Sequence, residues 1–142
     1  MTNLNSKQVG NITEIEVLLA LVKLGYTVLT PYGDCDRYDL LAEINKTFYR
    51  IQCKTAALDR DPEAFSFNCR STHKSGGKII HHKYSKDDID FFATSFRGKV
   101  YLIPVEQCGS RKVLRLNKPK NNHKTNVYYA NDYELEEVIK TL

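Results

Sequence analysis

The chain has 142 residues, of which 42% are hydrophobic and 27% are charged, and its formal net charge is +4. This length and ordinary composition predict one globular domain, residues 1–142, that is large enough to bury a hydrophobic core. No apolar run approaches the length of a membrane span, and the first residues lack the apolar segment of a secretory signal. We therefore expect a cytoplasmic protein with no membrane partner.

The charges are unevenly distributed along the chain. Residues 70–86 contain five Lys or Arg, three His and no acid, and residues 107–131 contain six Lys or Arg and no acid. Two such blocks on one domain favour a polyanionic partner, with nucleic acid first, although charge alone fits a solvated lysine-rich surface equally well. The four cysteines form no CxxC pair, so zinc-site spacing is absent and reduced thiols are expected.

Helical periodicity runs from about residue 10 to residue 24 and predicts an amphipathic helix. Its apolar arc is expected to contain Ile12, Ile15, Leu18, Leu19, Leu21 and Val22. Glu14 lies within this arc, where an ionised carboxylate is costly unless it is paired or bound to a metal. Near the start of a helix it could equally be a residue that favours the helix dipole, and the helix alone leaves both interpretations open.

The stretch from residue 38 to 55 predicts two antiparallel strands joined by a tight turn. Side chains alternate along a strand, so Asp39, Gln52 and Lys54 are expected on one side of this hairpin. The other side is apolar and belongs in a core; it consists of Leu40, Ala42, Ile44, Tyr49, Ile51 and Cys53.

The remaining elements are predicted from composition and alternation. Strands are expected at residues 26–30, 65–70, 89–96, 99–105 and 112–116, and a closing helix at 133–142. In strand 65–70, the outward face carries Ser66, Asn68 and Arg70. The first basic block contains Gly76-Gly77, which predicts flexibility or a tight turn. The sum is a mixed α/β domain with an initial helix, a mostly antiparallel sheet, a basic insertion and a closing helix.

The polar residues of the hairpin and the helix fit metal-assisted phosphodiester hydrolysis. Mg²⁺ prefers oxygen ligands, which Asp39, Glu14 and the backbone carbonyl of Cys53 can supply. Gln52 can offer an amide oxygen or a hydrogen bond to bound water, and Lys54 can stabilise developing negative charge. Each residue taken singly fits an ordinary surface or turn role better. Their joint spacing is what favours a catalytic site.

These residues resemble the pattern of the PD-(D/E)XK nuclease superfamily, and the longer runs around them look like its group I intron-encoded homing endonuclease branch of cyanobacterial type. The similar runs cover roughly residues 8 to 116; they are GNITE at 10–14, GYTVLTP at 25–31, RYDL at 37–40, YRIQCKT at 49–55, IDFFA at 89–93 and VYLIPV at 100–105. Two positions depart from the superfamily pattern: Tyr38 replaces Pro, and Gln52 replaces the usual acid, which removes one negative ligand. The homing branch that the longer runs resemble also has Gln at this position.

The resemblance implies a restriction-endonuclease-like core and a Mg²⁺-dependent enzyme, with Mn²⁺ able to substitute, that cuts double-stranded DNA at a long specific target. The active-site residues it implies are Glu14, Asp39, Gln52 and Lys54. Two rival functions stay open. One is a Holliday-junction-resolving or restriction-type nuclease on the same core, and the other is a catalytically inactive DNA-binding protein.

A DNA partner implies a nucleoid-associated protein, and cutting both strands with one site per chain implies at least a dimer. The resemblance to the homing branch implies a tetramer. Base edges are expected to meet Ser66, Asn68 and Arg70, while phosphates suit Lys74, Lys78, Lys83 and Lys86, with His81 and His82 able to join them.

Overall fold

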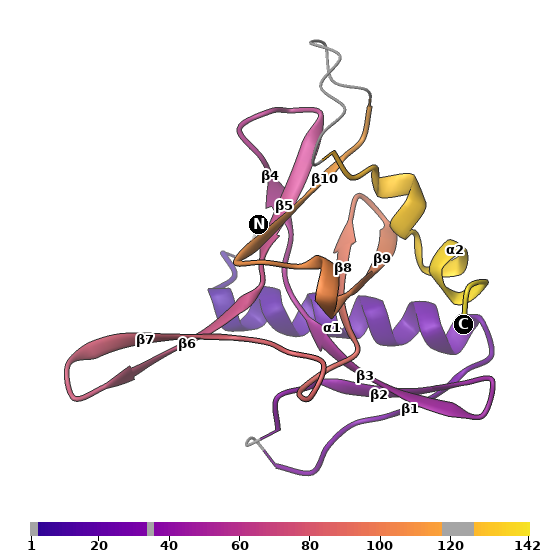
Figure 1. Cartoon of the computed structure of the whole chain (residues 1–142), viewed down its shortest axis with the longest axis horizontal. Helices are drawn as coiled ribbons and strands as arrows, with labels where there is room; N and C mark the ends of the chain where they lie inside the picture. The colour runs from indigo at the N-terminus through magenta and orange to yellow at the C-terminus, as the bar shows by residue number, and fades with distance from the viewer. Residues whose placement is uncertain (1–2, 34–35, 118–126) are drawn as a thin grey trace.

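Two helices, ten strands and two 3-10 turns make up the parts of the chain that the computed structural model describes, residues 3–33, 36–117 and 127–142 (Figure 1). In chain order they are α1 (Ser6–Lys23), β1 (Thr27–Leu29), β2 (Leu40–Ile44), β3 (Thr47–Cys53), β4 (Ala57–Leu58), β5 (Ala64–Asn68), β6 (Arg70–Ser75), β7 (Lys78–Lys83), β8 (Phe91–Phe96), β9 (Lys99–Pro104), η1 (Val105–Gln107), β10 (Arg111–Arg115), η2 (Ala130–Tyr133) and α2 (Leu135–Ile139).

The main sheet has five strands in the order β1-β2-β3-β8-β9. Only the central β3–β8 pair is parallel, so the prediction of a mixed, mostly antiparallel sheet is confirmed. The predicted hairpin is formed by β2 and β3, which pair with Leu40 opposite Ile51. Its turn lies at Asn45 and Lys46, which both adopt positive φ (53° and 65°), as tight hairpin turns require.

The sheet is covered on both faces, which gives three layers. Helices α1 and α2 pack on the face that carries Leu40 and Ile51, in a core that also contains Val17 of α1. The other face packs against the smaller sheet β10-β5-β4 through Phe65 and Phe92. An α/β fold with an N-terminal helix and a mixed sheet is therefore confirmed.

Helix α1 begins earlier than periodicity predicts because Asn5 caps it. The Asn5 side chain accepts a hydrogen bond from the Gln8 backbone N–H, and the Gln8 side chain accepts one from the Asn5 N–H, both at 2.9 Å. The helix ends at Lys23, and Gly25 follows with a φ of 89°.

The predicted apolar arc of α1 is wrong for most of its members. The face that the sheet buries consists of Thr13, Val17 and Leu21. Four arc residues are instead exposed on the far side of the helix; they are Ile12, Ile15, Leu19 and Val22. The sheet takes the face with Thr13, whose hydroxyl lies 3.0 Å from the Thr55 hydroxyl just after β3 and so joins helix to sheet.

The first basic block forms a two-stranded ribbon, β6–β7, that projects from the body of the molecule (Figure 1). Gly76 and Gly77 turn the chain with φ values of 56° and 78°, so the predicted tight turn is present. The ribbon starts at Arg70, so the predicted strand 65–70 is two elements. The closing helix is shorter than predicted at both ends, since η2 ends at Tyr133 and α2 spans only Leu135–Ile139.

The described part of the second basic block is largely neutralised. Arg111 pairs with Asp59, and Arg115 pairs with Asp61 at 2.6 Å. Lys112 is buried. Residues 118–126, which carry the rest of this block, lie outside the described residues. No described helix is long and apolar enough to cross a membrane.

Candidate active site

Three of the four predicted site residues meet where β2 begins and β3 ends. Asp39 comes just before β2, and its carboxylate accepts a hydrogen bond from the Cys53 N–H at 2.8 Å. The Asp39 N–H donates to the Ile51 carbonyl at 2.8 Å, which extends the hairpin ladder by one residue. This ladder puts Asp39 level with Gln52, on the face that alternation predicts.

Lys54 follows β3 directly. Its backbone N–H donates to the Ala93 carbonyl of β8 at 2.9 Å, which holds this strand end in the sheet. Its ammonium donates to the Arg70 carbonyl at the base of the ribbon, also at 2.9 Å. The Gln52 side-chain amide lies 3.5 Å from the Cys53 carbonyl.

Glu14 comes from α1 and lies close enough to Asp39 for their charges to interact. Burial raises the pKa of Glu14, and the negative charge of Asp39 raises it further. Burial also raises the pKa of Asp39, against the opposing effects of the Cys53 N–H and the Lys54 ammonium. Both carboxylates therefore resist ionisation. A divalent cation bound between them would stabilise their ionised forms.

The neighbouring groups respond to the same environment. Burial lowers the pKa of Lys54, while the Asp39 charge opposes this effect. Burial raises the pKa of the Cys53 thiol well above its ordinary value, and the charges of Asp39 and Glu14 add to the rise. The Cys53 thiol is therefore a neutral side chain, and only its backbone carbonyl is suited to a hard metal ion.

A pocket of about 310 Å³ opens beside the two carboxylates. It is lined by Glu14, Thr30, Pro31, Gly33, Asp36, Tyr38 and Asp39. Asp36 is a third carboxylate in this pocket that sequence reasoning left unassigned. Across the described ranges, no three His, Cys, Asp or Glu side chains lie close enough together to hold a metal ion. A complete oxygen ligand set therefore needs the Cys53 carbonyl, the Gln52 amide or water in addition to the carboxylates.

Two residues that sequence reasoning missed join the site to the ribbon. The Arg37 guanidinium lies 4.0 Å from the centre of the Tyr84 ring, and the Lys54 ammonium lies 5.4 Å from the same ring. Arg37 also donates to the Lys83 carbonyl at 3.4 Å. Only their positions in the sequence could have indicated these two residues: Arg37 lies two residues before Asp39, and Tyr84 directly follows the ribbon.

The predicted DNA-binding residues fall into separate groups. The prediction for Ser66 is wrong, because this residue is 8% exposed and its hydroxyl accepts a hydrogen bond from Arg111 at 2.8 Å. Asn68 is exposed, but its side chain accepts a hydrogen bond from the Arg70 N–H at 2.8 Å. Lys86 lies outside the ribbon and pairs with Glu106 at 3.6 Å.

The other predicted contacts lie on the ribbon, where the register assigns them to faces. Residues directly opposite each other share a face, so Arg70 and Lys83 lie together. Lys74 shares this face, as does His81, whose ring is 3.1 Å from the Thr72 hydroxyl. His82 and Lys78 lie on the opposite face, where the His82 ring stacks on His73 with 4.9 Å between ring centres.

The fold and this carboxylate–lysine arrangement define a nuclease of the restriction-endonuclease type. A family model described as PD-(D/E)XK endonuclease matches residues 4–136, and the chain belongs to this family. The superfamily resemblance is therefore confirmed.

Among solved structures, the chain is similar to a bacterial homing endonuclease, I-Ssp6803I. The two share 20% sequence identity and superpose with a TM-score of 0.76 over 97% of this chain and 95% of that chain. At this identity the similarity shows the fold, and the neighbour is of the homing type that the sequence resembles. No curated protein matches the chain.

Proposed function

We propose that this protein is a site-specific homing endonuclease that hydrolyses phosphodiester bonds of double-stranded DNA with Mg²⁺, for which Mn²⁺ can substitute. The observation that carries the proposal is the pair of carboxylates, Glu14 and Asp39, whose pKa values are both raised, beside the Lys54 ammonium at the end of β3. Family membership supports nuclease chemistry for the chain.

Asp39, Glu14 and the Cys53 carbonyl would hold the metal ion, since all three offer oxygen atoms at one edge of the sheet. When bound, the ion would supply an activated water molecule and would neutralise charge on the phosphate. Lys54 would stabilise the charge that develops on the phosphate oxygens. Gln52 would orient a ligand or a water molecule through its amide without adding negative charge.

The ribbon is the proposed DNA-binding element. A two-stranded ribbon fits the major groove, and exposed Lys74, Lys78 and Lys83 are suited to phosphates on either side of it. Its base contacts the site through the bond from Lys54 to Arg70. DNA that lies along the ribbon would therefore run past the two carboxylates.

One active site per chain cuts one strand, so we propose at least a dimer for double-strand cleavage, and a tetramer by the homing resemblance. Such an enzyme would work on DNA in the cytoplasm, at the nucleoid.

Incubation with a library of randomised linear duplexes, and in parallel with four-way junctions, tests the proposal. We expect Mg²⁺- or Mn²⁺-dependent cuts at one long target, with Asp39→Ala inactive and Asp132→Ala, an exposed acid on η2, fully active. Cleavage confined to four-way junctions would favour the junction-resolving alternative, and short recognition sites would favour the restriction type. If neither metal supports nicking of any DNA, the protein is a binding module.

A further inference from the structure

Helix α1 is apolar on two opposite faces. One face packs on the sheet, as described above. The other carries a row of large aliphatic side chains that remain 40–62% exposed. We call this row the α1 stripe; it consists of Ile12, Ile15, Leu19 and Val22.

Such a row is unusual on a helix that faces water. A surface helix normally turns charged and polar residues outward, and a helix that is hydrophobic all round is normally buried. Single exposed aliphatic residues are common, whereas a contiguous row marks an interaction surface. The stripe follows successive turns of the helix with steps of three, four and three residues, which keeps it on one side.

We propose that the α1 stripe is the contact between two copies of this chain, in which the α1 helices pack antiparallel about a two-fold axis level with residue 17. This inference deepens the proposed function, because cleavage of both DNA strands with one site per chain requires two chains.

The spacing of the stripe favours a second copy over an unrelated partner. A two-fold contact is self-complementary, so each residue of the patch must meet a residue of the same patch on the partner. The stripe reads the same in both directions. In an antiparallel pair centred on residue 17, Ile12 therefore meets Val22 of the partner subunit, and Ile15 meets Leu19 of the partner subunit. All four contacts are between aliphatic side chains of similar size.

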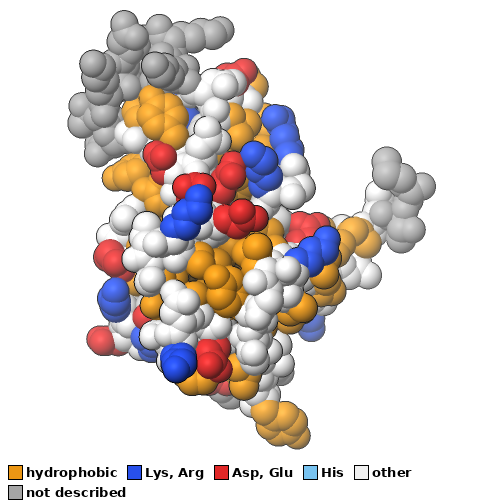
Figure 2. Space-filling view, turned by 90° about the vertical axis from the view of Figure 1, so that its right-hand side faces the viewer, with side chains coloured by type: hydrophobic (Ala, Val, Ile, Leu, Met, Phe, Trp, Pro, Cys, Tyr) orange, Lys and Arg blue, Asp and Glu red, His pale blue; other side chains and the backbone are white. Residues whose placement is uncertain are grey.

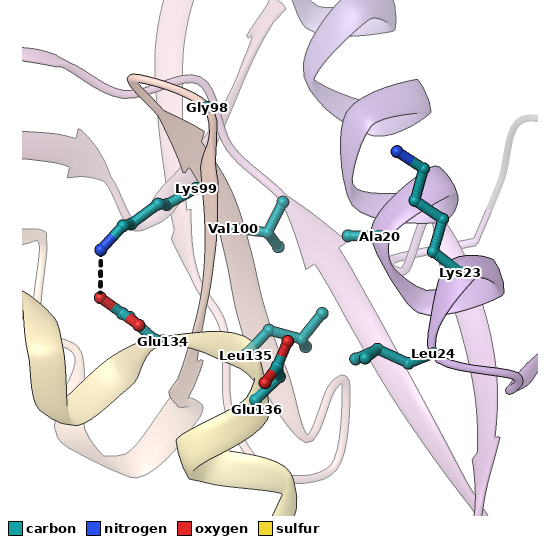
Figure 3. Close-up of a pocket in the computed structure, with 9 residues that line it drawn as sticks. All are labelled: Ala20, Lys23, Leu24, Gly98, Lys99, Val100, Glu134, Leu135 and Glu136. Atoms are coloured by element: carbon teal, nitrogen blue, oxygen red, sulfur yellow. Dashed lines mark hydrogen bonds and ion pairs between the residues drawn. The ribbon is translucent and has the colours of Figure 1, made fainter.

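The surface beside the stripe can extend the contact. An α-helix of this length covers only about 27 Å by 10 Å, less than the roughly 800 Å² that each partner buries in a standard interface. Lys23, one turn after Leu19, also lines a pocket of about 360 Å³ between α1, β9 and α2. Figure 3 shows Leu24, Val100 and Leu135 pointing into this pocket.

This pocket contains none of the predicted active-site residues. Its rim is charged, with Lys99 and Glu134 paired at 2.9 Å. Figure 2 looks onto the molecule from the side on which α1 ends and shows hydrophobic side chains exposed there.

The location of the stripe connects self-association to the active site. Glu14 belongs to the same helix, on the flank between the buried face and the stripe. Pairing of two α1 helices would therefore fix the positions of both Glu14 carboxylates relative to each other, as coordinated cutting of two strands requires.

Sedimentation velocity of the full chain without DNA tests the proposal. We expect the wild type to sediment as a dimer or a larger assembly. Ile15→Glu should raise the dissociation constant about 100-fold or more, because each two-fold contact then buries two carboxylates. Ile79→Glu is the matched control, since Ile79 is similarly exposed (60% against 62% for Ile15) but lies on the ribbon; this variant should associate like the wild type. Circular dichroism melting confirms that each variant is folded.

Disulfide cross-linking tests the register, with the wild type as the blank for the native cysteines. A mixture of Ile12→Cys and Val22→Cys chains should form a mixed disulfide dimer. Ile12→Cys alone should not, because two copies of residue 12 would lie about 15 Å apart along the helix axis.

A wild type that stays monomeric up to about 100 μM overturns the proposal, as does unchanged association of Ile15→Glu. Preferential cross-linking of Ile12→Cys to itself overturns the antiparallel arrangement. None of these measurements uses DNA or metal, so they stand apart from the nuclease proposal. A folded, monomeric Ile15→Glu that still nicks one strand would support both.

Discussion

Replacing Asp39 by Asn removes one of the two carboxylates but keeps the size of the side chain and an oxygen that can accept the Cys53 N–H. In the absence of metal, this substitution should not destabilise the fold at neutral pH, because burial disfavours the ionised form that it removes. With Mg²⁺ the wild type should become more stable and the variant should not. The difference between these two responses isolates the metal ligand from any general effect on folding.

The size of the response follows from binding linkage. A ligand at a hundred times its dissociation constant stabilises the folded state by about 2.7 kcal/mol. For a chain of 142 residues, each kcal/mol moves the melting temperature by about 3–4 °C, so saturating Mg²⁺ should raise the wild-type Tm by roughly 10 °C. Asp39→Asn should lose most of this rise. Asp132→Asn, the same substitution at an exposed acid, should keep it.

The stability of the metal-free protein should depend on pH in a defined direction. The raised pKa values of Glu14 and Asp39 mean that the folded chain binds protons more tightly than the unfolded chain, whose ordinary values are 4.5 and 3.8. The resulting stability is fully present below those values and is lost as pH rises through the folded pKa values. Metal binding requires the ionised forms, so the Mg²⁺-induced Tm rise should shrink as pH falls through the same range.

Differential scanning calorimetry with a Mg²⁺ titration against an EDTA baseline, repeated across pH, measures both effects. A full Tm rise in Asp39→Asn would refute the assignment of Asp39 as a ligand. A wild type with no Tm rise in Mg²⁺ or Mn²⁺ would refute the metal site.

Three further predictions concern positively charged side chains. Lys54→Met should slow single-turnover cleavage about 100- to 1000-fold and leave DNA affinity nearly unchanged, and cleavage near the wild-type rate would exclude Lys54 from the site. Lys74→Ala and Lys78→Ala should each reduce the slope of log affinity for DNA against log salt concentration by about 0.9. Lys46→Ala, in the β2–β3 turn, should leave this slope unchanged. Equal slopes in all three variants would contradict a DNA-binding ribbon. Arg37→Ala should reduce cleavage more than binding, because Arg37 connects the ribbon to the loop before β2; equal losses would mean that it acts only in binding.

Local patterns were sufficient to predict the β2–β3 hairpin. Strand alternation assigned Asp39, Gln52 and Lys54 to one side, and the register agrees with this assignment. A tight turn fixes which residues pair, and a period of two fixes which side chains share a face, so both are properties of a short stretch of sequence. The position of Glu14 could not be predicted in the same way, because the apolar arc that marked it as anomalous is largely exposed, and Glu14 lies on the flank of the face that the sheet buries.

Contacts between residues that are far apart in the sequence could not be predicted in this way. Ser66 has the alternation of an outward residue, yet Arg111, 45 positions later, covers its hydroxyl. The contact of Arg37 with Tyr84 likewise joins segments that no local pattern relates.

Helix α1 separates most clearly what the sequence determines from what the tertiary structure decides. The sequence by itself determined that a helix forms here and that Ile12, Ile15, Leu19 and Val22 share one face. Only the tertiary structure decided that the sheet takes the opposite face, with Thr13 and Leu21, and leaves the stripe exposed. The physical reason is that periodicity identifies which side chains lie together, whereas the surface that covers them is chosen by shape and hydrogen bonding with distant strands.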